Sequence, residues 1–321
     1  MSPKPAIKTL SRKRRRAYFR LLLAVFVVAA PFLFLYATGY RFESLTVFTK
    51  TGGIYVGAEQ ADAEIYLNGE LVHETGTFRR AFYVQDLKPG TYTVKVSKEG
   101  FHPWGKTLPV YEHIVTEAQA FNMPEEPLLV LIPSTFTNQT ANGTTTAIQP
   151  NSVYKAIVAS FATTTRPAAE IDRPSAEVET VDTPSSTTVP GVLAPKGQDN
   201  LGSGTVEFRG MRLSETGGRI LAQWTRDAES VPFYFCIRES VCTDEIELNT
   251  KEERAKYFDF FPGTTDVALV ALEGGVYVTE LDNRSGQNIQ PLYLAPDADF
   301  RIVDGGIYVK TADNTLYKVE I

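Results

Sequence analysis

The sequence predicts an all-β protein carried by one N-terminal transmembrane helix. Three observations support this fold class: an uncharged apolar run near the N-terminus, period-two alternation of apolar and polar residues over much of the remaining chain, and frequent turn residues. The 321 residues include 23 Gly and 19 Pro, which suits short strands joined by turns. Because 43% of the residues are apolar, the chain can bury hydrophobic cores, and its length suggests about two folded domains.

The first 20 residues form a basic tail. They hold eight Lys or Arg and no Asp or Glu, whereas the whole chain has a net charge of −6, so the remainder carries −14. A strongly acidic body repels phosphate backbones, and we therefore expect no nucleic-acid partner for the folded part. Because Lys and Arg before a membrane span stay on the cytoplasmic side, residues 1–20 are predicted to be a cytoplasmic tail.

A transmembrane helix is predicted over residues 21–38. The run from Leu21 to Ala37 contains no charged side chain and would span about 25 Å as a helix, so the lipid bilayer is an expected partner. With the tail inside, the C-terminal domains of this single-pass protein lie outside the cytoplasmic membrane. Two alternatives remain open: a signal peptide, although bulky Tyr36 and Tyr40 disfavour a cleavage site, and a basic arm that binds nucleic acid.

A small antiparallel β-sandwich is predicted over residues 50–124. Tyr92, Val94 and Val96 alternate with polar residues, as in a half-buried strand. Asn68-Gly69 separates two short apolar runs and is a strong hairpin signal. Lys88-Pro89-Gly90 predicts a type II turn with positive φ at the glycine. The expected strands cover residues 53–56, 65–67, 70–72, 82–84, 91–98, 106–111 and 116–121.

Four segments of this region have a distinctive order and spacing: residues 53–56 (GIYV), 63–70 (AEIYLNGE), 87–96 (LKPGTYTVKV) and 98–101 (KEGF). Through these segments the region resembles the PEGA domain of prokaryotic surface proteins. The tetrapeptide that gives the family its name is absent, and Lys88-Pro89-Gly90-Thr91 occupies its position. The resemblance implies a compact β-sandwich displayed outside the cell, without common catalytic residues to transfer.

Three aromatic residues of the same region are a candidate ligand site. Phe101, Trp104 and Tyr111 could form a stacking surface for a carbohydrate, or they could pack in the core or at a sheet edge. All three histidines of the chain also lie here, but their spacing matches no common metal-binding motif. We therefore predict neither a metal site nor a cofactor.

A low-complexity linker is predicted over residues 133–205, where Thr, Ser, Pro, Ala and Gly dominate. Few large apolar side chains are present to offset the conformational entropy of folding, so most of this stretch is expected to be an extended spacer. Val153 to Phe161 interrupts it, and its β-branched residues favour a strand. Leu128 to Ile132 favours another strand, and both are expected to dock on a folded region.

A second all-β domain is predicted over residues 206–321. Strand signals recur at short intervals, and residues 273–278 (EGGVYV) resemble residues 304–309 (DGGIYV). Repeated turn-plus-strand units resemble the meander sheets of β-propeller blades. The length of the domain suffices for about three blades of roughly 40 residues, fewer than a closed propeller needs, so we expect an incomplete stack of sheets.

The only two cysteines, Cys236 and Cys242, lie in this second domain. They would face each other across a hairpin, and outside the cytoplasm a structural disulfide is expected. Free thiols are the alternative; redox or metal chemistry is disfavoured, because the spacing is not C-x-x-C and no further ligands are evident.

The sequence contains no common catalytic or nucleotide-binding motif. The preferred hypothesis is a non-catalytic, membrane-anchored protein of the cell envelope that recognises a glycan, a wall polymer or another protein. The alternative is a surface hydrolase, or an accessory subunit of one, with its site on the distal β domain.

Overall fold

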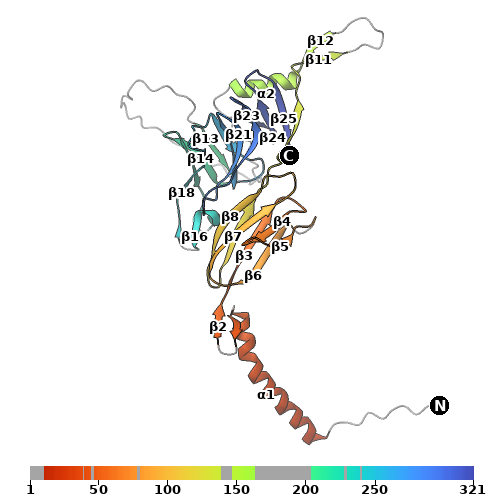
Figure 1. Cartoon of the computed structure of the whole chain (residues 1–321), viewed down its shortest axis with the longest axis vertical. Helices are drawn as coiled ribbons and strands as arrows, with labels where there is room; N and C mark the ends of the chain where they lie inside the picture. The colour runs from red at the N-terminus through yellow and green to blue at the C-terminus, as the bar shows by residue number, and fades with distance from the viewer. Residues whose placement is uncertain are drawn as a thin grey trace, which may run out of the picture. The chain divides into compact units, whose positions relative to one another are not determined.

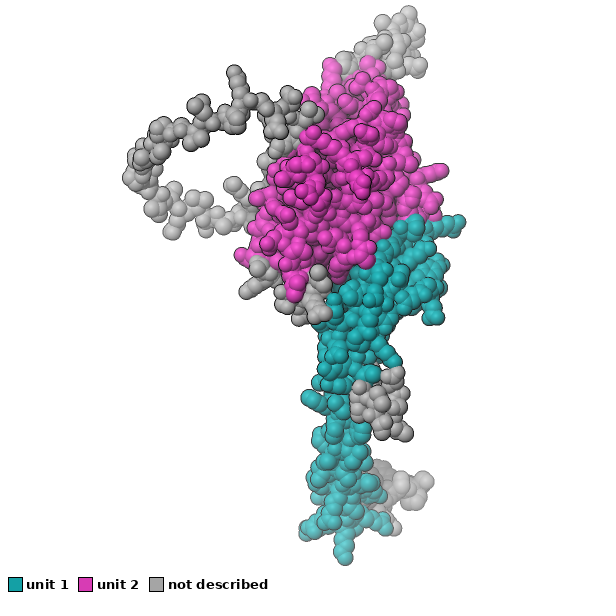
Figure 2. All heavy atoms as spheres, turned by 60° about the vertical axis from the view of Figure 1, so that its left-hand side comes forward, with its two compact units in different colours: residues 1–99, 103–122 teal, residues 100–102, 123–321 magenta. Residues whose placement is uncertain are grey.

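The computed structural model describes residues 11–38, 40–44, 47–77, 80–138, 147–162, 204–227, 230–238 and 241–321. The chain divides into two compact units, coloured separately in Figure 2. Unit 1 comprises residues 1–99 and 103–122, and unit 2 comprises residues 100–102 and 123–321. Apart from two α-helices and a short 3-10 turn, the described elements are strands, which confirms the predicted all-β class.

Unit 1 begins with helix α1 (Arg12–Ala37), which contains a very apolar window of mean hydropathy 2.3 and has no buried residue. Its 26 residues extend about 39 Å, so by length and composition the helix can cross a membrane. The helix starts at Arg12 rather than at Leu21, because Lys and Arg are good helix formers and continue it through the basic cluster. At its end, the Thr38 hydroxyl donates to the main-chain carbonyls of Phe34 and Leu35.

The rest of unit 1 is built mainly of two sheets (Figure 1). One sheet has the order β6-β3-β9 and the other β5-β4-β7-β8. Every pairing is antiparallel except that of β3 with β9. The core contains Ile54, Val96 and Trp104, all fully buried. The strands are β1 (Tyr40–Ser44), β2 (Val47–Lys50), β3 (Gly52–Ala58), β4 (Glu64–Leu67), β5 (Glu70–Glu74), β6 (Ala81–Leu87), β7 (Gly90–Ser97), β8 (Trp104–Val110) and β9 (Val115–Ala120).

The two predicted turns of unit 1 have different outcomes. Asn68 and Gly69 have φ values of 50° and 87°, as a two-residue hairpin requires, so that prediction is confirmed. Gly90 has no positive φ and instead opens β7, so the predicted type II turn is wrong. The left-handed residue nearby is Asp86, whose φ is 63°. Aspartate tolerates this conformation because its short polar side chain can hydrogen-bond locally.

Unit 2 contains three four-stranded antiparallel sheets. Two follow chain order, β13-β14-β15-β18 and β19-β20-β21-β22, and both are the blade-like meanders that were expected. The third has the order β10-β25-β24-β23, so an upstream strand completes it. The strand expected from Leu128 to Ile132, and its docking, are thereby confirmed.

The elements of unit 2 have the following bounds: β10 (Leu128–Leu131), β11 (Thr135–Asn138), β12 (Ala147–Pro150), α2 (Ser152–Ala162), β13 (Thr205–Phe208), β14 (Met211–Thr216), β15 (Arg219–Trp224), η2 (Phe233–Phe235), β16 (Cys236–Arg238), β17 (Val241–Cys242), β18 (Glu245–Glu247), β19 (Tyr257–Phe260), β20 (Val267–Leu272), β21 (Gly275–Glu280), β22 (Ile289–Leu294), β23 (Asp299–Val303), β24 (Gly306–Lys310) and β25 (Leu316–Glu320).

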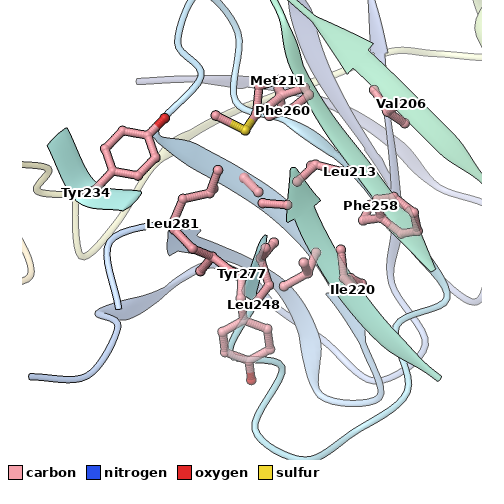
Figure 3. Close-up of a cluster of buried hydrophobic side chains, with 14 of the residues drawn as sticks. Val206, Met211, Leu213, Ile220, Tyr234, Leu248, Phe258, Phe260, Tyr277 and Leu281 are labelled. Carbon is pink, nitrogen blue, oxygen red and sulfur yellow. The ribbon is translucent and has the colours of Figure 1, made fainter. Parts of the chain in front are cut away.

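A hydrophobic cluster of unit 2 joins the first two sheets. Figure 3 shows Met211 and Leu213 of the first sheet near Phe260 of the second. The turn η2 contributes Tyr234, whose hydroxyl donates to the main-chain carbonyl of Thr265. Because these side chains come from distant parts of the sequence, the two sheets form one core rather than independent blades.

Residues 152–162 form helix α2 and not the strand that their β-branched residues favoured. Asn151 accounts for the helix start, because its side-chain oxygen accepts hydrogen bonds from the main-chain N–H groups of Val153 and Tyr154. Contacts with the third sheet hold the other end, where the Phe161 ring lies beside Arg301 and Lys310. Local capping and tertiary packing therefore outweigh strand propensity here.

The predicted linker, residues 133–205, is described only in part. Residues 135–138 pair with residues 147–150 in a hairpin of β11 with β12, and α2 follows it. Residues 139–146 and 163–203 lie outside the described residues, and so does most of the stretch that was expected to be an extended spacer. Residues 1–10 of the predicted basic tail lie outside them too.

Candidate functional site

The outer side of the three-stranded sheet in unit 1 carries two exposed tyrosines, and we call it the tyrosine face. Along β3, Ile54 and Val56 point into the core, whereas Tyr55 points outward and is 42% exposed. Tyr83 of β6 is 44% exposed and lies directly opposite Tyr55 in the strand register. The face consists of Gly53, Tyr55, Gly57, Tyr83, Gln85, Val115, Glu117 and Gln119.

Strand register places the side chains of the tyrosine face side by side. Tyr55 is paired with Tyr83 on one side and with Glu117 of β9 on the other. Directly opposite residues have Cβ atoms about 5 Å apart, so the two phenol rings and the carboxylate form one row across the sheet. The row combines flat apolar rings with hydrogen-bonding groups at its margins.

Glycines on either side of Tyr55 make the face flat. A Cβ atom at position 53 would lie 2.4 Å from the Tyr83 ring. A Cβ atom at position 57 would lie 2.1 Å from the side-chain oxygen of Gln119. Only glycine therefore lets the side chains of Tyr83 and Gln119 lie across β3, close to its backbone.

A pocket of about 370 Å³ adjoins one end of the tyrosine face. Tyr83, Gln85 and Val115 belong to both, so the face continues into the pocket. The pocket adds a carboxylate, an imidazole and two threonine hydroxyl groups to the polar groups of the face. Its lining is Ala37, Thr38, Thr51, Gly52, Tyr83, Gln85, Asp86, His113, Ile114 and Val115.

A β-bulge shapes this pocket. Gly52 pairs with Leu87 and Ile54 with Val84, so Gln85 and Asp86 together oppose one residue of β3. Asp86 and His113, which both line the pocket, have φ values of 63° and 60°. Left-handed backbone at non-glycine residues costs free energy and is concentrated at functional sites. Asp86 and His113 are two of the eleven non-glycine residues with positive φ among the described residues, so this strain accompanies the candidate site and does not by itself identify it.

The aromatic site predicted at Phe101, Trp104 and Tyr111 is not formed. Trp104 is fully buried in the core of unit 1, because its place at the start of β8 points the indole inward. Phe101 and Tyr111 are only partly exposed. In the described strands of the two sheets, the aromatic residues more than 40% exposed are Tyr55 and Tyr83, neither of which was selected from the sequence. A tyrosine with a glycine two residues away on each side is visible in the sequence.

The predicted cysteine pair is joined in the structure. Cys236 and Cys242 are register partners in the short hairpin of β16 with β17, and their sulfur atoms form a disulfide. Among the described residues, no group of three or more His, Cys, Asp or Glu side chains could hold a metal ion. His73 stacks on Phe82 and His113 packs edge-on against Tyr40, so the two are held by aromatic contacts.

Buried carboxylates of unit 2 are engaged in internal contacts. Asp282 forms a hydrogen-bonded ion pair with Arg284 at 2.7 Å, and Glu280 accepts hydrogen bonds from Asn288. Burial raises the pKa of the Asp266 carboxyl, and the nearby negative charge of Asp282 raises it further. The contacts of Asp282 and Glu280 are internal to the fold. The linings of four pockets in the described residues contain none of Asp266, Glu280 and Asp282.

Residues 51–123 match the PEGA domain. The match begins just before β3, ends just after β9 and agrees closely with the boundaries expected from the sequence, residues 50–124. It therefore includes the whole tyrosine face. The PEGA domain suggests a surface or extracytoplasmic protein. No curated protein matches the chain.

Proposed function

We propose that this protein is a membrane-anchored, extracytoplasmic glycan-binding protein that holds a polysaccharide on its tyrosine face. Helix α1 supplies the anchor, since it is long and apolar enough to span a bilayer. The cluster from Arg12 to Arg16 favours a cytoplasmic N-terminus, which puts the sandwich outside the cytoplasmic membrane.

The observation that carries the proposal is the exposed pair Tyr55 and Tyr83 on a glycine-lined sheet. Sugar rings present flat C–H surfaces and hydroxyl groups at their edges. A phenol ring offers a matching apolar surface at a low cost in side-chain entropy. Gln85, Gln119 and Glu117 supply donors and acceptors for the hydroxyl groups. The row across three strands suits an extended chain of sugars better than a compact ligand.

The charge of the tyrosine face and its pocket limits the kind of glycan that they could bind. The tyrosine face and its pocket contain Glu117 and Asp86 but no Lys or Arg. The chain after residue 20 also carries a net charge of −14. A polyanion such as a phosphate-linked wall polymer would be repelled, so the proposed ligand is a neutral or amino-sugar polysaccharide.

The proposed role is non-catalytic. Glycoside hydrolysis generally uses two carboxylates at a defined separation in one cleft. Of the two carboxylates of this region, only that of Asp86 lines the pocket, whereas Glu117 lies on the open sheet. A surface hydrolase with its site on unit 2 is the second candidate, and product release is the result that would favour it.

A panel of soluble glycans tests the proposal. Full-length protein in lipid nanodiscs should retain β-1,4-linked oligosaccharides such as cellohexaose or N-acetylchitohexaose, and it should not retain alginate, a polyanion. Retention without shortening of the oligosaccharide is expected, and release of shorter products would contradict a purely binding role. On intact cells that express the protein, external protease should abolish retention, because the sandwich is expected outside the membrane. Retention that survives protease would contradict this orientation.

A further inference from the structure

Strand β10 ends the third sheet of unit 2 with an uncovered apolar edge. Its four residues, Leu128 to Leu131, are all exposed, so neither face of the strand is covered by the core. It pairs with β25 on one side only, and no described strand pairs with its other side. Edge strands are normally protected by charge, proline or a bulge. The register of β10 is continuous, and the strand carries no charge and no proline.

Exposed apolar side chains of unit 2 are concentrated around this edge. Leu294 of β22 is 65% exposed and lines a pocket of about 330 Å³ together with Leu129. Ile321, which follows the β25 residue paired with Leu128, is 52% exposed. Of the eight large apolar side chains of unit 2 found exposed in the described residues, six belong to this patch and only Val153 and Val241 lie elsewhere. Contiguous apolar patches of this kind mark interaction surfaces.

The hydrogen-bond pattern tells which main-chain groups of β10 face outward. The N–H of Ile132 donates to the carbonyl of Leu316 at 2.8 Å, so this residue pair is a hydrogen-bonded one. In an antiparallel ladder such pairs alternate, and Val130 therefore also bonds to β25. The N–H and C=O groups of Leu129 and Leu131 consequently point away from β25. An added β-strand is the occupant that would pair these groups.

We propose that the occupant is β10 of a second copy of this chain, related by a twofold axis at Val130. In that antiparallel register Leu129 faces the partner's Leu131, and Leu131 faces the partner's Leu129. All four outward main-chain groups of each copy are then paired, and two sheets join into one of eight strands. The strand is complementary to itself because one register satisfies both copies, as a twofold interface requires.

Charge and packing also favour a second copy. Glu125 and Glu126 precede β10, and the antiparallel arrangement places these acidic residues at opposite ends of the interface. The contact itself is made by uncharged strands, although each chain is strongly acidic after residue 20. The pocket beside Leu129 offers apolar surface to the partner's Leu131. A contact between two four-residue strands is expected to give only weak dimerisation in solution. Confinement of both chains in one membrane would favour dimerisation.

Cysteine cross-linking tests the register. The native cysteines are bonded to each other, so Val130→Cys introduces the single free thiol of the chain. At the twofold axis the two Cα atoms would be about 4.5 Å apart, within the range of a disulfide. In full-length protein in intact cell membranes, the oxidant diamide should convert most Val130→Cys chains into a covalent dimer. Val153→Cys, a valine of unit 2 away from the edge, is the matched control and should remain monomeric.

A lysine substitution distinguishes cross-linking through paired β10 strands from cross-linking through random collisions. Leu131 and Val153 are each 55% exposed, so lysine substitutions at these positions are matched in exposure. Adding Leu131→Lys to Val130→Cys should reduce the dimer at least fivefold, whereas adding Val153→Lys should leave it unchanged. Equal cross-linking of Val130→Cys and Val153→Cys would overturn the proposal, and so would insensitivity to Leu131→Lys. Because glycan retention is measured separately, this result is independent of the proposed function.

Discussion

Asp266 shows how a single half-buried side chain contributes to the pH dependence of stability. Its carboxyl is largely removed from water, and the pKa is raised first by burial and then by the negative charge of Asp282. A raised carboxyl pKa means that the folded state binds a proton more readily than the unfolded state. This group therefore reduces the free energy of unfolding as the pH rises above the ordinary value of 3.8.

Substitution of Asp266→Asn removes this charge and should stabilise the protein at pH 7. We expect a gain of about 1 kcal/mol, or roughly 3 °C in Tm, that shrinks toward zero as the pH approaches 4. Thermal unfolding of the full-length protein between pH 4 and pH 8 measures it. Asp282→Asn is the control and should lower the stability at pH 7, because it leaves the buried guanidinium of Arg284 without its anionic partner. An Asp266→Asn variant that loses stability at pH 7 would contradict this reasoning.

The difference between Trp104 and Tyr55 shows what the sequence can reveal about single residues. Both lie in strands, and period-two alternation indicates that residues on one side of a strand share a face. Alternation does not indicate which of the two faces is buried when the sequence neighbours of an aromatic residue are small or polar. Trp104 therefore seemed a candidate for ligand stacking, although its indole fills the core. The glycines beside Tyr55 were the informative signal, because glycine in a strand often marks a close approach of other groups.

Among the elements, α2 docks on the third sheet through several contacts, and most of those at its C-terminal end involve Arg301. The Arg301 guanidinium lies between the rings of Phe161 and Tyr257, at 4.8 and 3.8 Å from their centroids. It also donates to both carboxylate oxygens of Asp299 and to the main-chain carbonyl of Ser160. These contacts join the helix to β23 and β19, so they explain why an apolar run with β-branched residues docks as a helix.

Substitution of Arg301→Lys should loosen α2, because lysine keeps the charge but loses the planar stacking and the donor to Ser160. The expected loss is about 2 to 4 kcal/mol in urea unfolding, with faster hydrogen exchange of the α2 amides than of β20. Arg219→Lys is the matched control. Its pair with Glu247 is largely exposed, so the change should cost less than about 1 kcal/mol. Unchanged exchange in α2 after Arg301→Lys would show that other contacts hold the helix.

Strands were easier to predict than the ways in which they assemble. Alternation and turn residues located the sandwich strands, and the Asn68-Gly69 hairpin has the backbone that its residues require. The docking of Leu128 to Ile132 was expected, but its partner strand β25 was not, and neither was the parallel pairing of β3 with β9. Both pairings join residues far apart in the chain, and local sequence patterns do not specify such partners.

At the scale of the whole molecule, composition located the main parts. The basic tail and the uncharged run predicted an anchor, and α1 is a helix of suitable length and hydropathy. The PEGA match covers residues 51–123 and the predicted sandwich residues 50–124, so the two agree in extent. The sequence predicted the kind of candidate site, a surface of aromatic rings, but not the residues that form it. Its location depends on which residues the two sheets bury, and that is a property of the assembled fold.

Calorimetric titration can show whether the tyrosine face binds the proposed glycan. Full-length protein in nanodiscs is titrated calorimetrically with whichever of cellohexaose and N-acetylchitohexaose it retains, and a variant with both Tyr55→Ala and Tyr83→Ala is compared with Tyr66→Ala. Tyr66 is the control because it lies on the outer side of the other sheet, paired with Lys95. Loss of two stacking rings should weaken binding about tenfold or more, while Tyr66→Ala leaves the affinity unchanged. Equal affinities for the double variant and the unmodified protein would contradict the account.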